Sequence, residues 1–298
     1  MVQPGQSPSD LVAGWARFDW RESFFAPGLA ILQALTLHGE TASGAGETRE
    51  DALQRCLGET AEYAALRGAA ALGIDPGFNS LRDGLAAHPD AALARQLAWC
   101  EMVERRAVAA WWLGQSTASR LADGWLADTG IAGRLARLRH GAALRRVSSF
   151  WLIARSREPF TMICASHSQE GQSGVLGYGT ALTAVEAAEK AMREVLLMEL
   201  NLMEQIAERH LDGESSGRPI MPRGAGFAHH LAQRLPFDAV PVTPPPGDAP
   251  DFTPEDSVEY RDLTPDGGPL CVWLCRSGSA VPRFPAPAFP APAGSPFF

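Results

Sequence analysis

The chain has 298 residues, of which 46% are hydrophobic and 20% charged, and its formal net charge is -8. This composition is typical of a soluble globular protein with a full core, and the acidic balance argues against non-specific nucleic-acid binding. No apolar run approaches the roughly 20 residues of a membrane helix, and the N-terminus lacks a secretory signal pattern. We therefore expect a cytoplasmic protein that binds neither nucleic acid nor membrane.

The first part of the chain predicts two short strands and two long helices. Strand-like segments are expected at residues 15–24 and 29–39, and helices at 52–72 and 89–114. A glycine-rich turn at 41–47 separates the two strands from the first helix, and Thr48 can cap that helix. Pro89 suits the first turn of the second helix. Both helices lack internal proline, which supports their length.

The second half predicts further strands and a third long helix. Strands are expected at residues 148–156, 159–167 and 269–277, and a helix with a long apolar stripe at 183–210. The basic run at 134–140 favours a solvated helix face over a surface for an acidic partner. No internal repeat is evident in the sequence.

No composition shift marks a linker between autonomous domains. We therefore expect a single domain over residues 1–298. A proline-rich loop is expected near 241–257, and the proline-rich C-terminal tail at 282–298 is typical of polyproline II.

The five cysteines are odd in number and widely spread, so a disulfide framework is not expected. Cys271 and Cys275 form the segment CVWLC. In a strand both would share one face with Trp273, which favours a place in the core. A metal role for the two thiols stays open, although the sequence supplies no partners nearby.

Five glutamates on otherwise apolar helical segments are the candidate site residues. Glu59 and Glu62 are three residues apart, as are Glu101 and Glu104, so each pair points from one helix face. Glu194 lies in the third helix. Carboxylates that converge on one cleft raise one another's pKa unless cations hold them. The pattern therefore indicates bound magnesium and a phosphate-bearing ligand.

Three motifs around these glutamates resemble the ATP-binding signatures of the YcaO family. The matching residues are Gly44, Ala45, Gly46, Ala52, Gly58, Glu59 and Glu62 in the first motif, Gly84, Leu85, Ala86, Ala87, Glu101, Glu104, Arg105, Trp111 and Trp112 in the second, and Gly177, Gly179, Ala187, Lys190, Ala191 and Glu194 in the third. Each motif is weak alone, but the three occur in order and without gaps.

The resemblance implies an α+β protein with the YcaO-like fold, in which β-sheets pack with long helices around a cleft for ATP and Mg2+. In similar proteins the two E-x-x-E pairs hold magnesium ions that bridge nucleotide phosphates. The same role is implied here for Glu59, Glu62, Glu101 and Glu104, and Mg2+ prefers such oxygen ligands. The family also implies that Arg105, Lys190 and Glu194 contact the nucleotide. Simple ion pairs are the structural alternative, within the helix for Lys190 and Glu194 and at the surface or between helices for Arg105.

The implied activity is that of an ATP-dependent cyclodehydratase of peptide natural-product biosynthesis. Such enzymes activate a backbone amide of a ribosomally synthesised precursor peptide by phosphorylation and form an azoline. Thioamide or amidine formation by the same activation is an alternative. The resemblance implies a partner protein that binds the leader peptide, and it is compatible with a dehydrogenase partner and a homodimer.

Several positions depart from the family pattern, among them Lys190 in place of an arginine, and three further departures bear on ATP turnover. Ala45 replaces a lysine, Tyr63 replaces an arginine, and Arg106 stands where an aspartate is usual. These departures leave a second hypothesis, a non-catalytic scaffold in a peptide-modification complex. The retained carboxylates favour the enzyme, because they cost stability when no metal is bound.

Overall fold

The fold was analysed in a computed structural model that describes residues 8–154, 159–212, 225–236, 238–245 and 258–277. The chain divides into two compact units. The first comprises Met1–Glu22, Leu29–Arg106 and Asp251–Val281, and the second comprises Ser23–Gly28, Ala107–Pro250 and Pro282–Phe298. The single domain over 1–298 stays a prediction. Most of the proline-rich loop and the whole proline-rich tail lie outside the described residues.

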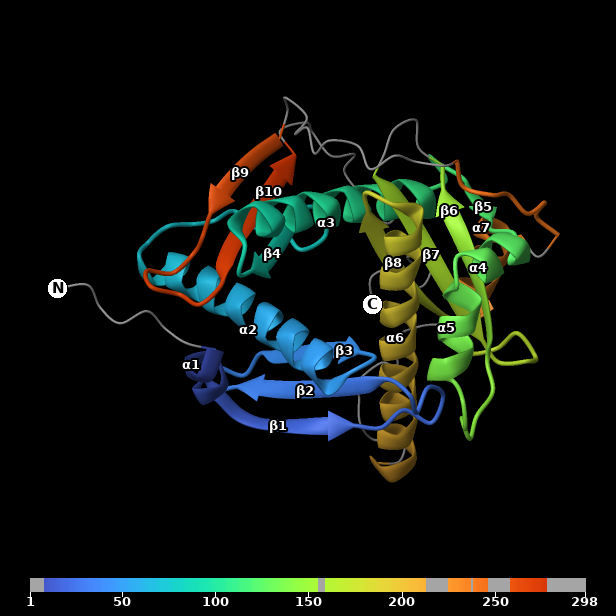
Figure 1. The fold of residues 1–298 in the computed structure, drawn as a ribbon, viewed down its shortest axis with the longest axis horizontal. Coiled ribbons are helices and arrows are strands. Elements are labelled where there is room, and N and C mark those ends of the chain that lie inside the picture. The colour runs from blue at the N-terminus through green and yellow to red at the C-terminus, as the bar shows by residue number, and fades with distance from the viewer. Residues whose placement is uncertain (1–7, 155–158, 213–224, 237, 246–257, 278–298) are drawn as a thin grey trace. The chain divides into compact units, whose positions relative to one another are not determined.

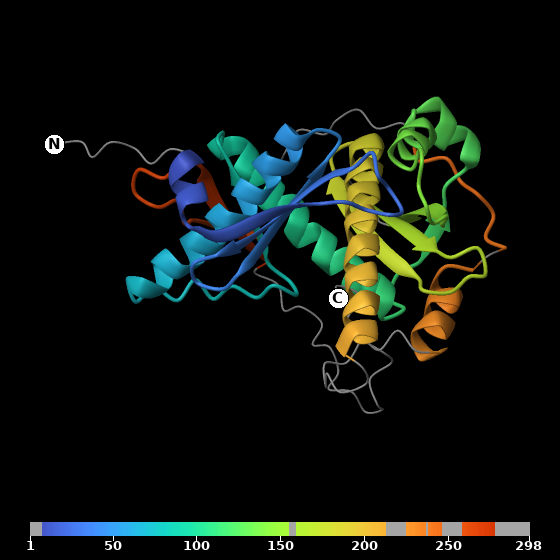
Figure 2. The same ribbon diagram turned by 90° about the horizontal axis from the view of Figure 1, so that it is seen from below.

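The first unit begins with a three-stranded antiparallel sheet (Figure 1). Its elements are α1 (Pro8–Ala13), β1 (Trp15–Arg21), β2 (Ala30–Thr36), β3 (Thr41–Gly46) and α2 (Arg49–Ala71). The strand order is β1-β2-β3, and Figure 2 views this sheet from the side of β1. The Thr48 hydroxyl accepts a hydrogen bond from the Asp51 N–H at 3.1 Å and so caps α2, as predicted. Helix α2 packs against β2 and β3.

A second antiparallel sheet completes the first unit. It comprises β4 (Gly84–His88), β10 (Cys271–Ser277) and β9 (Val258–Asp262), in the order β4-β10-β9. Helix α3 (Ala91–Trp112) starts just after Asp90, whose carboxylate accepts from the backbone N–H groups of Ala92 and Leu93. One hydrophobic core joins α2 to both sheets and includes Leu32, Cys56 and Val272.

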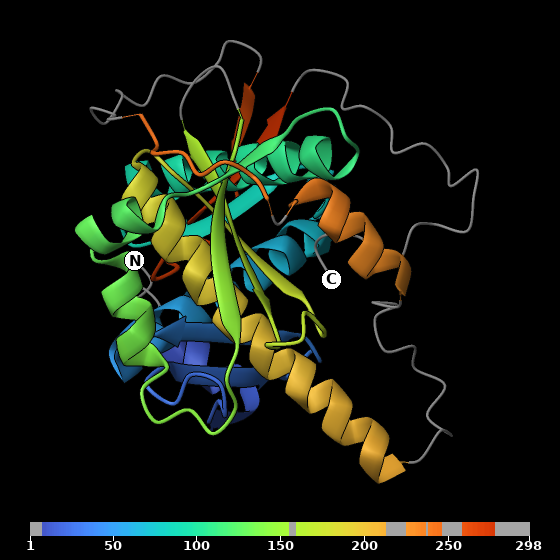
Figure 3. The ribbon, with the colours of Figure 1, turned by 90° about the vertical axis from the view of Figure 1, so that its right-hand side faces the viewer.

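The second unit is built on a four-stranded antiparallel sheet. Its strands are β5 (Ala118–Arg120), β6 (Val147–Ile153), β7 (Phe160–His167) and β8 (Val175–Ala181), paired in that order. Its helices are α4 (Asp123–Asp128), α5 (Ile131–Leu138), α6 (Ala184–Asp212) and α7 (Ala225–Arg234). Helix α6 runs across the face of β7 and β8 (Figure 3). None of the helices in the described ranges has the length and apolar character needed to span a bilayer.

The three long predicted helices correspond to α2, α3 and α6, and the predicted strands correspond to β1, β2, β6, β7 and β10. The strands that sequence reasoning missed are rich in glycine and alanine, residues with low strand propensity. They include β3, which was expected to be a turn, and also β4 and β8. All three carry the glycines of the motifs that resemble the YcaO signatures.

These glycines allow a strand backbone to lie directly against a helix. A Cβ atom at Gly44 would lie 2.0 Å from the Ala52 carbonyl oxygen on α2, and one at Gly84 would lie 1.9 Å from the Ala98 carbonyl oxygen on α3. At Gly177 it would lie 2.2 Å from the Val195 nitrogen on α6. No side chain fits at such distances. Packing against the helix therefore requires glycine at these positions, although glycine has a low strand propensity.

The cysteines behave as small hydrophobic residues. All five thiols are free, and Cys275 is buried on β10 with its Sγ 3.8 Å from the Met102 Sδ. Cys271 lies on the same strand and is half-buried. Across the described part of the chain, no three His, Cys, Asp or Glu side chains form a group that could hold a metal. The strand prediction for this segment is confirmed, and the structure adds no ligand for a metal role of Cys271 and Cys275.

We predict that Gly177→Ala destabilises the protein by about 2 kcal/mol or more, because the methyl group overlaps the α6 backbone. Gly68→Ala in α2 is the control, since its Cβ would meet no atom within 4 Å. That change should stabilise the helix by about 0.5–1 kcal/mol. Chemical denaturation measures both, and equal effects of the two substitutions would contradict the packing argument.

Candidate functional site

The three glycine-bearing strands share one contact with the helix that follows each of them. A backbone N–H of the strand donates to a glutamate that lies 16 residues later in the chain. The bonds are Ser43 N to Glu59 Oε2 at 2.7 Å, Leu85 N to Glu101 Oε2 at 2.8 Å, and Tyr178 N to Glu194 Oε2 at 2.7 Å. The same strand-and-helix arrangement therefore occurs three times, although the sequence shows no repeat.

Each bond fixes one oxygen of a carboxylate and so orients the whole side chain. The second oxygen of Glu59 accepts a hydrogen bond from the Tyr63 hydroxyl at 3.1 Å. The second oxygen of Glu101 accepts from the Arg105 guanidinium one turn later on α3. Arg105 therefore forms an ion pair, but as an i,i+4 pair within α3 and not at the surface or between helices as the alternative had it. Because both glutamates have partners on two sides, their carboxylates are held in place before any ligand binds.

Glu62 completes the group of acids in the first unit. Its Oε1 accepts from the Ala87 N–H of β4 at 3.0 Å. Burial raises the pKa of Glu62 well above its ordinary value of 4.5, and the negative charges of Glu101 and Glu59 raise it further. Burial likewise raises the pKa of Glu59. These carboxylates therefore share one region whose field favours a bound proton or cation.

The donors of this region suit magnesium held together with a phosphate. Glu104, half-buried, lies three residues after Glu101 on α3. Because no group of three acids, histidines or thiols within the described ranges could hold a metal, the protein side chains do not form a closed cage. Magnesium commonly binds through one or two carboxylates and takes its remaining ligands from phosphates and water. Glu59, Glu62, Glu101 and Glu104 fit that requirement.

Lys190 and Glu194 belong to the second unit, on α6. The ammonium of Lys190 donates to the Thr180 carbonyl oxygen of β8 at 3.0 Å. Glu194 accepts from the same strand, at Tyr178. The structure thus brings these two residues together at β8, while Glu59, Glu62, Glu101 and Arg105 are together in the first unit.

A comparison with protein-family models decides the affiliation. A family described as a YcaO cyclodehydratase that binds ATP and Mg2+ matches residues 69–263, more than half of the chain. The chain belongs to the YcaO family. Its family is one of ATP-dependent cyclodehydratases, with ATP and Mg2+ as cofactors. The matched range contains Glu101, Glu104, Lys190 and Glu194, and it begins after Glu59 and Glu62.

Solved structures show the same fold. The structure of YcaO from Methanopyrus kandleri bound with AMPPCP and Mg2+ has a TM-score of 0.61 and 15% identity, over 92% of this chain and 91% of that chain. The E. coli microcin synthetase McbBCD complex with pro-MccB17 bound has a TM-score of 0.59 and 14% identity, over 93% and 90%. A heterocyclase in complex with substrate and cofactor has a TM-score of 0.57 and 14% identity, over 92% and 52%. The α+β YcaO-like fold is confirmed, and a comparison with curated proteins gives no match.

The departures from the YcaO pattern occupy defined places. Ala45 is buried on β3. The Tyr63 hydroxyl donates to Glu59, so a neutral donor stands where the family has a cationic one. Arg106 donates from Nη1 to the Ser277 hydroxyl at 3.2 Å. Glu59 therefore has a neutral donor in place of a cationic one, while Arg106 directs its added positive charge at Ser277.

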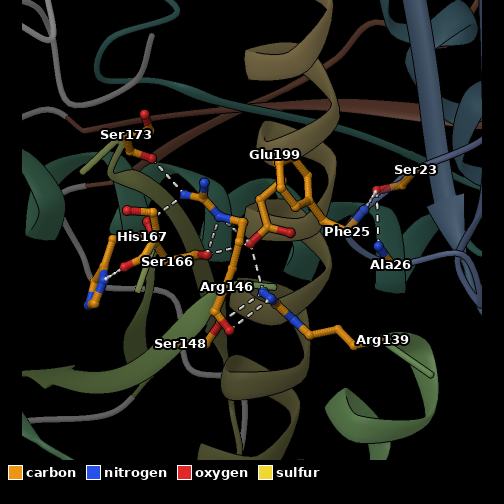
Figure 4. A network of polar contacts seen from close by, with 11 residues as sticks. Ser23, Phe25, Ala26, Arg139, Arg146, Ser148, Ser166, His167, Ser173 and Glu199 are labelled. Atoms are coloured by element: carbon orange, nitrogen blue, oxygen red, sulfur yellow. Dashed lines mark hydrogen bonds and ion pairs between the residues drawn. The ribbon is translucent and has the colours of Figure 1, made fainter. Parts of the chain in front are cut away.

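A buried glutamate that sequence reasoning missed anchors the YcaO helix α6. Glu199, five residues after Glu194, is fully buried, and its Oε1 accepts from Arg139 Nη2 at 2.6 Å and from the Ser166 hydroxyl of β7 (Figure 4). The Nε of Arg146 lies 3.2 Å from the same oxygen. Because these partners come from three other segments, the network fixes α6 against the sheet that carries the Lys190 and Glu194 contacts.

This network also corrects the interpretation of the basic run at 134–140. A solvated helix face was expected, but Arg139 points its guanidinium at the buried Glu199. Arg134 pairs with Glu189 of α6. The helical period of the run was visible in the sequence, whereas its acidic partners lie 55 to 60 residues later, beyond the reach of a local pattern.

We predict that Glu62→Gln stabilises the metal-free protein at high pH. The folded-state pKa of Glu62 lies above the ordinary 4.5, so its stabilising effect is complete below that value and is lost as the pH rises through the folded pKa. In EDTA the wild type should lose stability as the pH rises above the ordinary pKa of 4.5, and the variant should lose less over the same range. Glu22→Gln removes an exposed carboxylate as the control. Parallel pH profiles for all three proteins would contradict the assignment.

We predict that Glu199→Ala lowers the free energy of unfolding by about 3–5 kcal/mol, because it leaves Arg139 and Arg146 buried without a counter-charge. Gln205→Ala, further along α6 and partly exposed, should change it by less than about 0.5 kcal/mol. Urea denaturation distinguishes the two. A loss at Glu199 no larger than that at Gln205 would show that the network contributes nothing.

Proposed function

We propose that this protein activates a backbone amide of a ribosomally synthesised precursor peptide by ATP-dependent phosphorylation and closes an azoline ring. The observation that carries the proposal is the group formed by Glu59, Glu62 and Glu101, three carboxylates whose mutual repulsion a bound cation relieves. Membership of a family of ATP-dependent cyclodehydratases supports it.

The chemistry divides into an attack and an elimination. A Cys, Ser or Thr side chain of the substrate adds to the carbonyl carbon of the preceding amide and releases its S–H or O–H proton to solvent, and the carbonyl π electrons move to oxygen. When bound, ATP supplies the phosphoryl group that this oxygen takes up, with release of ADP, and Mg2+ neutralises the phosphate charges. Loss of phosphate and of the amide proton then leaves the C=N bond of the azoline. The backbone amide is a poor electrophile, so the phosphoryl group is what makes its oxygen a leaving group.

The residues of the chain would position and neutralise charge rather than react covalently. Glu59, Glu62, Glu101 and Glu104 would hold magnesium, and the strand N–H groups that bind Glu59, Glu62 and Glu101 keep these carboxylates from rotating away. Such preorganisation saves the free energy that ordering flexible glutamates would cost on binding.

Arg105, Lys190 and Glu194 would contact the nucleotide. Arg105 would offer its guanidinium to a phosphate, and Lys190, as a compact ammonium, would act as a point charge without a bidentate grip. With Ala45 in place of the family lysine, these two are the cations that the motifs retain.

The thioamide and amidine alternatives use the same activation with a different nucleophile. Mass spectrometry of the treated peptide separates the outcomes. Loss of one water indicates an azoline, replacement of one oxygen by sulfur indicates a thioamide, and loss of one water through attack by an amine indicates an amidine, which resists the mild acid that opens azolines.

We further propose that a separate protein captures the leader peptide in the cytoplasm and delivers it to this chain. The McbBCD structure was solved as a complex with pro-MccB17 bound, which supports the proposal of partner proteins and of a peptide substrate. A dehydrogenase that oxidises the azoline, and a second copy of this chain, are further proposed partners. Complete modification of the precursor by this chain alone would contradict the need for a leader-binding partner.

We predict that Glu101→Gln lowers phosphate release in the presence of ATP, Mg2+ and the precursor peptide by about 100-fold or more. Removal of this carboxylate takes away one proposed magnesium ligand and the partner of Arg105. Glu50→Gln, on the exposed first turn of α2, is the matched control and should keep wild-type turnover. Wild-type turnover of Glu101→Gln would contradict the role assigned to this carboxylate. A lack of turnover in the wild type and in both variants would favour a non-catalytic scaffold.

A further inference from the structure

The outer strand of the first sheet exposes aromatic side chains. Within the described residues, β1 forms backbone pairs only with β2, so its other edge has no partner strand there. Phe18 is 51% exposed and Trp20 is 36% exposed. Their cross-strand partners, Ala34 and Leu32, belong to the core beneath α2, which places both aromatic residues on that face of the sheet. An exposed edge with large apolar side chains favours the addition of another strand.

The opposite face of the same strand carries two unpaired charges. Arg17 lies across from Leu35, and Asp19 lies across from Gln33, so neither has a charged cross-strand partner. Both are exposed, and neither forms an ion pair with a residue in the described ranges. The edge therefore presents a cation and an anion two residues apart, together with aromatic side chains on the other face.

We propose that β1 pairs with β1 of a second copy of this chain, antiparallel and around a two-fold axis that lies midway between the two Phe18 residues. In a continuous sheet, residues directly opposite each other point to the same side, so one residue must face its own copy across the axis. Near the middle of β1 the candidate positions are Arg17, Phe18 and Asp19.

Charge selects among these three registers. An axis at Phe18 places Arg17 opposite the partner's Asp19, and the symmetry repeats this pair on the other side. An axis at Asp19 places Asp19 opposite the partner's Asp19 and Arg17 opposite the partner's Arg21. An axis at Arg17 places two arginines face to face. Because like charges directly opposite destabilise a sheet, only the Phe18 register is favourable, and it also brings the two Phe18 rings together.

The resulting contact is short. A register irregularity between Trp15 and Arg17 ends the regular strand on one side. In the Phe18 register the regularly paired segment is therefore limited to Arg17, Phe18 and Asp19 on each copy. The two sheets would join into one of six strands, with α2 of each copy on the same face. An interface of this size is below that of stable dimers, so we expect a reversible dimer with a dissociation constant in the micromolar range. The pairing does not depend on the peptide chemistry proposed above.

The test uses the two charges as a matched pair in the full-length protein. Sedimentation velocity should show a wild-type dimer that dissociates on dilution. Arg17→Asp gives a strand with two acids, and Asp19→Arg gives a strand with two bases. Each variant alone should therefore stay monomeric at concentrations at which the wild type dimerises. An equimolar mixture of the two variants should dimerise again, because opposite charges then face each other on both sides of the axis.

The control is Asp123→Arg in α4, a charge reversal at a side chain that is 86% exposed, which should dimerise like the wild type. Circular dichroism verifies that each variant folds. If a charge-reversal variant does not fold, Asp19→Asn takes its place, and this variant should weaken the dimer. A wild type that is monomeric up to about 0.1 mM overturns the proposal. So does a variant mixture that stays monomeric. Binding of the precursor peptide to β1 of a monomeric protein would assign the edge to the substrate and would also overturn it.

Discussion

The close approach of three strands to three helices is the constraint on which the rest of the structure depends. At Gly44, Gly84 and Gly177 the strand backbone occupies space that any side chain would fill. This contact brings strand N–H groups within hydrogen-bond distance of glutamates on the helices. A peptide N–H is a rigid, uncharged donor, so it orients a carboxylate without cancelling its negative charge. The acids stay both fixed and available for a cation.

In the metal-free protein the carboxylates of the site interact unfavourably with one another. Glu59, Glu62 and Glu101 repel one another, and burial disfavours the charged forms of Glu59 and Glu62. Within the first unit Arg105 stands beside them, whereas Tyr63 contributes a neutral hydroxyl where the family motif has an arginine. The stability of the fold is therefore coupled to its ligands, since a cation that binds this region removes the repulsion that the folded chain otherwise retains.

Much of the fold and of the candidate site could be predicted from the sequence. The long helices followed from their composition and caps, and the spacing of Glu59, Glu62, Glu101 and Glu104 within ungapped motifs indicated the family. Strands β3, β4 and β8 were missed, since their glycines are selected by helix contact and not by strand propensity. Glu199 was missed because its partners Arg139, Arg146 and Ser166 are far away in the chain, and nothing local distinguishes a buried glutamate from an exposed one.

The constant separation of 16 residues between strand donor and glutamate divides the chain into segments that tolerate length changes and segments that do not. One residue inserted in α2 before Glu59 would rotate its side chain by about 100° around the helix axis, away from the Ser43 N–H. The same holds between Leu85 and Glu101 and between Tyr178 and Glu194. The turn-rich stretch at 73–83 between α2 and β4 has no such restriction. Relatives of this protein should therefore gain and lose residues in the connections between the three strand-and-helix arrangements and never inside them.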